Sequence, residues 1–327
     1  MAPQVHHYLY RSWAWACGIL VLVLVLGGGE ALSLDHYHQS CPKAEAAVTA
    51  TVKQAMANDK TVPAALLRMH FHDCFVRSCD GSVLLDSTGN FTAEKDGPPN
   101  ASLHAFYVID KAKQTVEALC PGVVSCADIL ALAARDAVAL SGGPIWSLPL
   151  GRRDGRVSLA KETTTLPGPT ASFDQLKQAF HGRGLSTKDL VVLSGGHTLG
   201  FAHCSSFQNR IHGFRRNADV DPALSPPFAA ALRRACPANN TARAAGSAMD
   251  STSTAFDNAY YRMLLSGRGL FSSDEALLTH PKTRGFVALY AASHDAFFKA
   301  FIDSMLRMSA LNAAGEVRAN CRRINSS

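Results

Sequence analysis

The sequence predicts a mainly α-helical globular protein, and three observations support this fold class. The chain has 327 residues, of which 47% are hydrophobic and 18% charged, so it can bury a substantial core and is neither disordered, collagen-like nor a multi-pass membrane protein. Signals that start and end helices recur at intervals typical of helices joined by loops. No stretch alternates apolar and polar residues between hairpin turns, so we expect little β structure.

Helix candidates follow one another along the chain. The first three are residues 45–57, 62–75 and 105–119. The fourth is the clearest, because Ser125 and Asp128 have the spacing of a capping box, residues 129–140 are rich in alanine and leucine, and a Gly-Gly-Pro run ends the segment. Capping patterns also start a helix at Ser172, ending at Gly182, and another at Ser186. The last candidates are residues 227–235, 257–265, 281–291 and 296–308.

An N-terminal segment precedes the predicted domain. Arg11 comes before an apolar stretch, residues 14–26, and small residues follow up to Ala31, which is typical of a secretory signal peptide over residues 1–31. The alternative, a membrane anchor, needs about 20 apolar residues, and this run is shorter. Further along the chain, the proline-rich segment 166–169 is the expected seam between two lobes.

Charge and cysteine content narrow the class of protein. The net charge of +6 is spread along the chain without a run of five like charges, which favours a solvated surface over a nucleic-acid interface. Cys17 lies in the signal segment, and the other eight cysteines indicate four disulfides formed in an oxidising compartment. No two cysteines have C-x2-C spacing, which argues against a cytosolic zinc protein. Sequons at Asn90, Asn100, Asn239 and Asn325 agree with secretion.

Two histidines suggest the chemistry, and the first is His72. If residues 68–75 are helical, Arg68 and His72 share one face with Phe71 beside them, and His70 points elsewhere. An imidazole that takes a proton and a fixed positive charge that stabilises the departing oxygen suit the heterolysis of a peroxide. Alternatively, Arg68 forms a surface ion pair and His72 is a hydrogen-bonded core histidine.

The second histidine is His197, which follows Gly195 and Gly196 near the end of a predicted helix. Small residues would let a large flat group such as haem approach the backbone, so His197 is a candidate axial iron ligand. Its other ring nitrogen would need an acceptor, for which Asp274 is the candidate. A capping or core role is the alternative for this histidine.

Together the motifs resemble the class III secretory plant peroxidases over about residues 34–325. The matching segments are Arg68 to Phe75, Ser125-Cys-Ala-Asp-Ile129, Gly151-Arg-Arg-Asp154, Ser194 to Gly200, Phe256-Asp-Asn-x-Tyr-Tyr261 and Asn320-Cys-Arg322. The resemblance implies a two-lobed, mainly α haem peroxidase fold over residues 32–327 with little β structure. The haem would lie between a distal lobe, residues 32–166 with the C-terminal tail, and a proximal lobe, residues 167–305.

The same resemblance implies an activity and its cofactors. The protein would bind haem b and two Ca²⁺ ions, reduce hydrogen peroxide through a ferryl intermediate, and oxidise small phenolic or aromatic donors in one-electron steps. It would be a monomer with no nucleic-acid partner and no membrane partner after signal cleavage. Only six residues follow Cys321, so we expect secretion to the extracellular space and cell wall rather than vacuolar targeting.

Residue roles in the haem site also follow from the resemblance. His72 matches the distal acid–base histidine, and Arg68 the distal arginine that assists O–O cleavage and stabilises the ferryl oxygen. Asn100 matches the asparagine that accepts a hydrogen bond from the distal imidazole, which predicts a buried side chain without glycan. The remaining matches are Glu94 to the acid linking this network to the distal calcium, His197 to the proximal ligand, Asp274 to its supporting carboxylate, Pro167 to the donor-binding residue at the haem edge, and Phe71 to a wall of the haem pocket.

Two calcium sites and a disulfide pairing complete what the resemblance implies. The distal site would comprise Asp73, Val76, Ser78, Asp80 and Ser82, with Ser78 standing where the family commonly has glycine. The proximal site would comprise Thr198, Asp250, Thr252, Ala255 and Asp257. Its loop, residues 250–256, is one residue shorter than the family pattern and has Ser253 in place of the customary proline. The disulfides would be Cys41–Cys120, Cys74–Cys79, Cys126–Cys321 and Cys204–Cys236.

Two other functions remain as alternatives. A haem-binding extracellular glycoprotein without significant turnover would be expected to lack Arg68, His72 or Asn100, and all three are present. A zinc hydrolase using His70, His72 and His203 would be expected to carry an H-E-x-x-H helix, which the chain lacks.

Overall fold

Helices account for most of the regular structure in residues 31–239, 242 and 244–326, which are the residues that the computed structural model describes. The mainly α fold class is therefore confirmed. The predicted signal segment, apart from Ala31, lies outside the described residues. The α-helices are α1 (Ala44–Asn58), α2 (Val62–Val76), α3 (Phe106–Leu119), α4 (Cys126–Leu140), α5 (Phe173–His181), α6 (Thr187–Ser194), α7 (Gln208–Ile211), α8 (Pro226–Ala235), α9 (Ala259–Leu265), α10 (Ser272–Thr279), α11 (Pro281–Ala292) and α12 (His294–Ser309).

Each predicted helical segment overlaps one of these helices, with small differences at the ends, and the late starts of α3 and α9 have a local cause. Ala105 has a left-handed backbone conformation (φ 64°), so α3 begins one residue later than expected. Asp257 lies before α9 rather than inside it, because its Oδ1 accepts a hydrogen bond of 2.6 Å from the backbone N–H of Ala259. Side-chain acceptors of this kind satisfy the free N–H groups of a first turn.

Short elements make up the rest of the regular structure. Strands β1 (Phe201–His203) and β2 (Gly246–Ala248) form an antiparallel pair in which Phe201 lies opposite Ala248. The 3₁₀ helices are η1 (Ser82–Leu84), η2 (Glu94–Asp96), η3 (Pro98–Asn100), η4 (Ala160–Thr165), η5 (Gly195–Thr198) and η6 (Cys204–Ser206). The sequence analysis did not predict α7, α10 or the strand pair. The strands have three residues each, α7 has four and α10 has eight, which are too few to establish a clear period.

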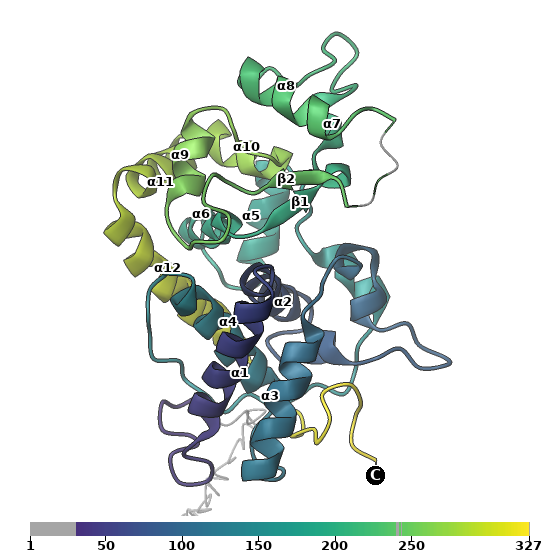
Figure 1. Cartoon of the computed structure of the whole chain (residues 1–327), viewed down its shortest axis with the longest axis vertical. Helices are drawn as coiled ribbons and strands as arrows, with labels where there is room; N and C mark the ends of the chain where they lie inside the picture. The colour runs from purple at the N-terminus through teal and green to yellow at the C-terminus, as the bar shows by residue number, and fades with distance from the viewer. Residues whose placement is uncertain (1–30, 240–241, 243, 327) are drawn as a thin grey trace, which may run out of the picture.

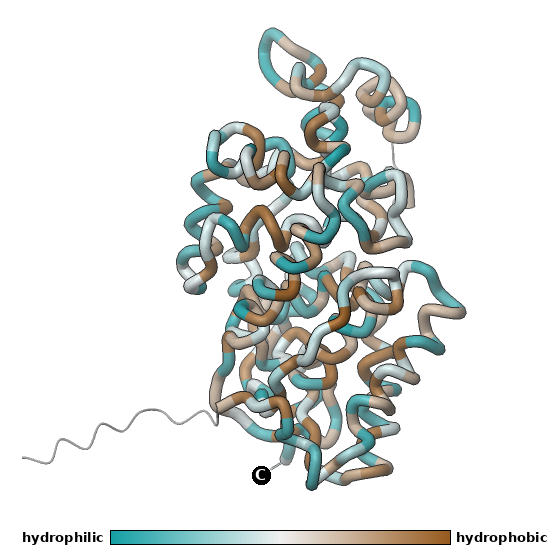
Figure 2. The backbone as a smooth tube through the Cα atoms, turned by 90° about the vertical axis from the view of Figure 1, so that its left-hand side faces the viewer, coloured by the Kyte–Doolittle hydropathy of each residue, from teal (hydrophilic) through white to brown (hydrophobic). Residues whose placement is uncertain are grey.

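Two groups of helices lie at opposite ends of the molecule. Helices α1 to α4 form one group and α5 to α11 the other, while α12 runs between them (Figure 1). Figure 2, turned by 90°, shows the two groups stacked one above the other. Helix α2 lies at their junction, because Leu66 and Met69 belong to the core of the first group, and Leu67 and Phe75 to that of the second. A third, smaller core lies under α7, α8 and the strands.

Four disulfides cross-link the chain. Their partners are Cys41–Cys120, Cys74–Cys79, Cys126–Cys321 and Cys204–Cys236, which is the pairing that the resemblance implied. The bridge between Cys126 and Cys321 spans 195 residues and ties the C-terminal tail to the start of α4. In the chain-entropy treatment, closing a loop of this length stabilises the fold by about 5 kcal/mol. Among the described residues, no helix has the length and apolarity needed to span a membrane.

Candidate active site

Helix α2 carries Arg68 and His72 one turn apart. Arg68 donates from Nη1 to Ser102 Oγ and from Nη2 to the Pro99 carbonyl, both at 2.9 Å, so the guanidinium is held by the loop before α3. Burial by the surrounding protein lowers the pKa of Arg68 to about 10, yet part of the side chain remains accessible to solvent. At this pKa the guanidinium stays positively charged at neutral pH.

The hydrogen bonds of Asn100 define which nitrogen of His72 is free. The Asn100 Nδ2 group donates to the Glu94 carbonyl at 2.8 Å, so its Oδ1 faces His72 Nδ1, 2.5 Å away. An amide oxygen can only accept, and His72 must therefore carry its proton on Nδ1. Nε2 then keeps its lone pair and is available as a base.

The electrostatic surroundings keep His72 neutral. Its side chain is 7% exposed, and burial together with the charge of Arg68 lowers the pKa of His72 to about 3, although the hydrogen bond to Asn100 opposes this. At neutral pH the imidazole is therefore ready to accept a proton rather than already protonated. Asn100 itself is only 1% exposed, as expected for a sequon that stays unmodified.

His197 lies on η5, and a carboxylate contacts one of its two ring nitrogens. Its Nδ1 is 2.9 Å from Asp274 Oδ1, and the carboxylate also accepts hydrogen bonds from Tyr260 Oη at 2.8 Å and from the backbone N–H of Phe271 at 2.9 Å. Burial raises the pKa of Asp274, but His197 and these hydrogen bonds outweigh it and the net pKa is lowered. The side chain of His197 is 40% exposed while that of Asp274 is 2% exposed, so the accessible part of the imidazole is the end that carries Nε2.

The two glycines before His197 differ in their surroundings. A Cβ on Gly195 would collide with Tyr261 and Phe297, so this glycine serves the packing of η5 against α9 and α12. A Cβ on Gly196 would meet only Leu67 Cδ2, at 3.3 Å. The expectation that small residues here admit a flat ligand stays a prediction.

Carboxylates gather near Glu94 and η1. Burial raises the pKa values of Asp73 and Asp80, and the two charges lie close enough to influence each other. Burial likewise raises the pKa of Glu94 to about 8. Both carboxylate oxygens of Glu94 and the Ser82 hydroxyl are buried without a hydrogen-bond partner among the described residues. Unpaired buried oxygens of this kind are the ligands that a hard cation prefers.

The backbone next to these carboxylates takes the turn that the predicted cation site needs. Ser78 adopts φ 103°, in the region that favours glycine, and its carbonyl accepts a hydrogen bond of 2.8 Å from the N–H of Asp80. Val76 is the last residue of α2. The serine therefore occupies the conformation that a glycine would adopt more easily.

Hydrogen bonds link four of the residues predicted for the second cation site. Thr198 Oγ1 lies 2.6 Å from Asp250 Oδ2 and 3.3 Å from Asp257 Oδ1, and Thr252 donates to Asp250 Oδ1 from its backbone N–H at 2.7 Å. Burial raises the pKa of Asp250, and the charge of Asp257 adds to this effect. The N–H of Ala255 donates to the Thr252 carbonyl at 2.7 Å, which turns the loop through these residues.

Phe71 lies beside His72, and Pro167 lies in a loop that contacts α10. The ring of Phe71 is edge-on to His72, with centroids 5.9 Å apart, and stacks on Phe75. Pro167 is partly exposed, and two residues later the Pro169 carbonyl accepts a hydrogen bond of 2.9 Å from the N–H of Ser273 in α10. The loop that carries Pro167 is therefore fixed to the helix that carries Asp274.

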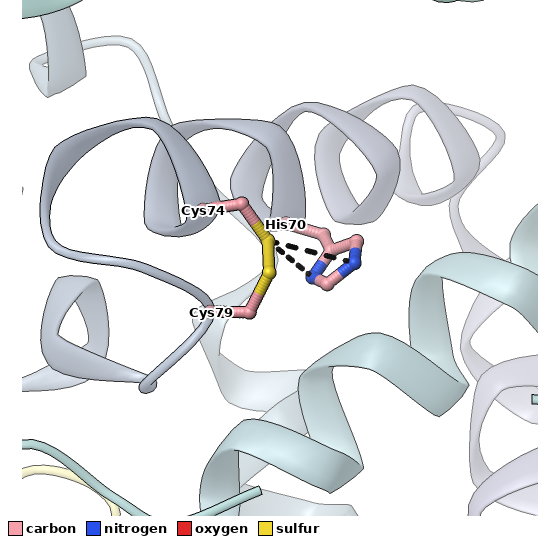
Figure 3. Close-up of side chains that lie close together, drawn as sticks. All are labelled: His70, Cys74 and Cys79. Atoms are coloured by element: carbon pink, nitrogen blue, oxygen red, sulfur yellow. Dashed lines mark hydrogen bonds between the residues drawn. A yellow bond between two sulfur atoms is a disulfide. The ribbon is translucent and has the colours of Figure 1, made fainter. Parts of the chain in front are cut away.

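The histidines of the zinc-hydrolase alternative have separate partners. Figure 3 shows His70 against the disulfide of Cys74 and Cys79, and its Nε2 is 2.9 Å from Ser309 Oγ. Among the described residues this is the one group of three close metal-ligand side chains, and its sulfurs are bonded to each other. His203 is exposed on β1, whereas His72 is paired with Asn100. The three imidazoles of that hypothesis therefore do not form one site.

The sequence analysis missed residues that support His197. Tyr260 lies within the Phe256 to Tyr261 motif, but nothing in that motif indicates that its hydroxyl contacts Asp274. Phe271 was not singled out, because its contribution is a backbone N–H. A separate surface recess of about 350 Å³, lined by Lys53, Met56, Lys60 and Leu140 among others, contains none of the predicted site residues.

Comparison with known proteins agrees with this geometry. A sequence model of the peroxidase family matches residues 48–293. The chain is 64% identical over 296 residues to Peroxidase 64 of Arabidopsis thaliana, covering 90% of this chain and 93% of that protein. It is 51% identical over 298 residues to Peroxidase 66 of Arabidopsis thaliana, covering 90% and 92% of the two chains. It is 49% identical over 301 residues to Peroxidase 1 of Oryza sativa subsp. japonica, covering 88% and 91%. The chain therefore belongs to the class III plant peroxidases, and it is a haem peroxidase that acts on hydrogen peroxide with donor substrates.

Proposed function

We propose that His72 is the acid–base residue, that Arg68 stabilises the developing charge, and that His197 is the axial ligand of the haem in a secreted peroxidase that oxidises phenolic or aromatic donors. The observation that carries this proposal is the chain of hydrogen bonds from Glu94 through Asn100 to His72, which leaves His72 Nε2 unprotonated beside the guanidinium of Arg68.

The residues present fit a haem. His197 would offer Nε2 to the iron while its Nδ1 is bonded to a carboxylate, which is the arrangement that fixes and strengthens an axial imidazole. Both Arg68 and His197 are accessible, whereas their neighbours in the site His72, Asn100 and Asp274 are buried. When bound, haem would supply an iron centre that exchanges electrons with peroxide and with donors.

Proton movement is the contribution of the distal residues. Nε2 of His72 takes the proton from one oxygen of hydrogen peroxide and returns it to the other oxygen as the O–O bond breaks, so that one water leaves. Arg68 donates hydrogen bonds to the oxygen on which negative charge develops. Over the full cycle, two donor molecules each supply one electron and one proton, and hydrogen peroxide is reduced to two waters.

Phenolic donors suit this arrangement because they are oxidised at the edge of the site. Pro167 is partly exposed and lies in a loop that is hydrogen-bonded to α10, so a flat ring could approach its carbonyl from the surface. We further propose the two lobes at residues 32–166 with the tail and 167–305, a monomeric state, cleavage of residues 1–31 during secretion, and two bound Ca²⁺ ions at the sites named above.

The proposal is tested by the rate at which the haem-reconstituted protein reacts with hydrogen peroxide in stopped-flow absorbance. We expect His72→Ala to bind haem normally but to react about 10²- to 10⁴-fold more slowly, because general-base assistance is lost. The matched control is His203→Ala, which removes an exposed histidine of β1 and should react at the wild-type rate. An unchanged rate in His72→Ala would reject the assigned base, and a wild-type protein that binds haem but does not react would favour the haem-binding glycoprotein without turnover.

A further inference from the structure

Arg210, a buried arginine of α7, forms hydrogen bonds with the backbone segment that precedes α10. Arg210 is fully buried, and its Nε donates to Asp221 Oδ2 at 2.8 Å. Its Nη1 donates to the carbonyls of Gly269 at 2.6 Å and Phe271 at 3.1 Å, and its Nη2 lies 3.7 Å from Glu275 Oε2. A guanidinium is the side chain suited to this task, because its donors have a fixed planar geometry and can reach several acceptors at once.

Phe271 connects this arginine to the candidate axial ligand. While its carbonyl accepts from Arg210, its N–H donates to Asp274 Oδ2 at 2.9 Å. The ring of Phe271 is edge-on to His197, with centroids 5.2 Å apart and planes at 84°. The other oxygen of Asp274 bonds His197 Nδ1. Phe271 therefore contacts both groups: its N–H binds the Asp274 carboxylate, and its ring packs against the His197 imidazole.

Helix α10 depends on contacts of this kind because it is short. It has eight residues, and Asp274 lies in its first turn, where the backbone N–H groups have no partners within the helix. Asn209, next to Arg210, donates to Ser272 Oγ at 3.2 Å and gives α7 a second contact with the same turn. Contacts from α7, in addition to those within α10, therefore fix the position of Asp274.

We propose that Arg210 is a positioning residue that tunes the basicity of the His197 imidazole by holding the carbonyls of Gly269 and Phe271 and thereby aligning Asp274. The inference rests on the proposed role of His197 as axial ligand. When the alignment is lost, the hydrogen bond from Nδ1 to the carboxylate weakens, and the imidazole becomes a poorer electron donor.

The test uses Arg210→Lys in the haem-reconstituted, full-length protein. Lysine keeps the positive charge beside Asp221 but cannot reach Asp221 and both carbonyls together. The readout is the stretching frequency of the bond between ferrous iron and histidine, measured by resonance Raman spectroscopy at matched haem content. We expect a shift to lower frequency that lies between wild type and Asp274→Asn, because the latter loses the carboxylate outright.

A matched control separates positioning from general damage. Arg152 is a second buried arginine that bonds Asp128 and the Ser309 carbonyl in the other part of the molecule. We expect Arg152→Lys and Arg210→Lys to lower the melting temperature by similar amounts. Only Arg210→Lys should shift the iron–histidine stretching frequency. If Asp274→Asn shifts the frequency and Arg210→Lys does not, the inference is wrong. If neither Asp274→Asn nor Arg210→Lys shifts the frequency, the proposed roles of His197 and Asp274 are wrong instead.

A second variant covers the case in which Arg210→Lys does not fold. Asp221→Asn leaves the guanidinium in place but removes the charged acceptor of its Nε. We expect a smaller shift in the same direction as for Asp274→Asn. A frequency identical to wild type in folded Asp221→Asn protein would equally overturn the inference.

Discussion

The orientation of one amide determines what His72 can do. Because Asn100 Nδ2 is bound to the Glu94 carbonyl, the amide cannot rotate to offer a donor to the imidazole, and the proton of His72 stays on Nδ1. The resemblance implied that Asn100 accepts from His72, but the physical cause of that direction is where the 3₁₀ turns η2 and η3 place the Glu94 carbonyl. That placement is a tertiary property that no spacing in the sequence reveals.

A substitution at Asn100 tests this residue-scale argument. Asn100→Val keeps the approximate size of the side chain but removes the acceptor for Nδ1–H, so His72 should become a weaker base. We expect the reaction with hydrogen peroxide to slow by about 10- to 100-fold, in line with the loss of other imidazole-supporting partners. Stopped-flow absorbance measures this rate, and Asn90→Val, at an exposed sequon, is the control. Equal rates in both variants would contradict the role given to Asn100.

Helices were predicted best where the sequence carries clear capping, hydrophobic and stop signals. Helix α4 has a capping serine, an alanine- and leucine-rich body and a Gly-Gly-Pro end, and it forms almost where expected. Helices α7 and α10 were missed, because four and eight residues leave no room for a hydrophobic period and their stability comes from contacts such as those of Arg210. The packing role of Gly195 in η5 was not predicted, since its partners Tyr261 and Phe297 come from distant helices.

Asp189 provides an element-scale prediction, because it joins the start of α6 to α12. Its Oδ1 accepts from Ser304 Oγ at 2.7 Å and from Arg307 Nη2 at 2.5 Å, and its Oδ2 accepts from the N–H of Ser186 at 2.8 Å. Burial raises the pKa of Asp189, but Arg307 and the other hydrogen bonds outweigh it and lower the pKa from 3.8 to about 2. A carboxylate with a lowered pKa stabilises the folded state above its unfolded pKa, and that stabilisation is lost as the pH falls through the folded value.

We therefore expect Asp189→Asn to lower the free energy of unfolding by about 1–3 kcal/mol at pH 7, the range for hydrogen bonds to a charged group after allowing for the half-exposed Arg307. The difference from wild type should shrink between pH 4 and pH 2. Urea unfolding followed by circular dichroism measures both quantities, with the exposed Asp303→Asn as control. A difference that stays constant over this pH window would contradict the assignment.

At the scale of the whole molecule, the fold brings buried carboxylates together in two places. Burial raises the pKa values of Asp73, Asp80 and Glu94 near η1, and the charge of Asp80 adds to this at the other two. Asp250 and Asp257 lie together near Thr198. Grouping charges in the interior is unfavourable unless a cation neutralises them. The resemblance predicted both clusters, whereas local sequence alone could not have distinguished them from solvated acidic loops.

Calcium removal tests the two proposed cation sites. We expect atomic emission analysis to find two Ca²⁺ per chain, and EGTA to lower the melting temperature reversibly, because an ion that binds only the folded state stabilises it. Asp80→Ala and Asp250→Ala should each retain one ion. The exposed variant Asp303→Ala should retain both. A protein that contains no Ca²⁺, and whose melting temperature does not change with EGTA, would show that these clusters are not calcium sites.

The central claim is that the haem iron is bonded to His197 through Nε2. The most direct measurement is the spectrum of His197→Gly reconstituted with haem, recorded before and after adding imidazole. The account predicts that the variant lacks the histidine-ligated spectrum, that imidazole restores it by filling the space of the missing ring, and that His203→Gly resembles wild type throughout. A histidine-ligated spectrum in His197→Gly without added imidazole would contradict the account, because another residue would then hold the iron.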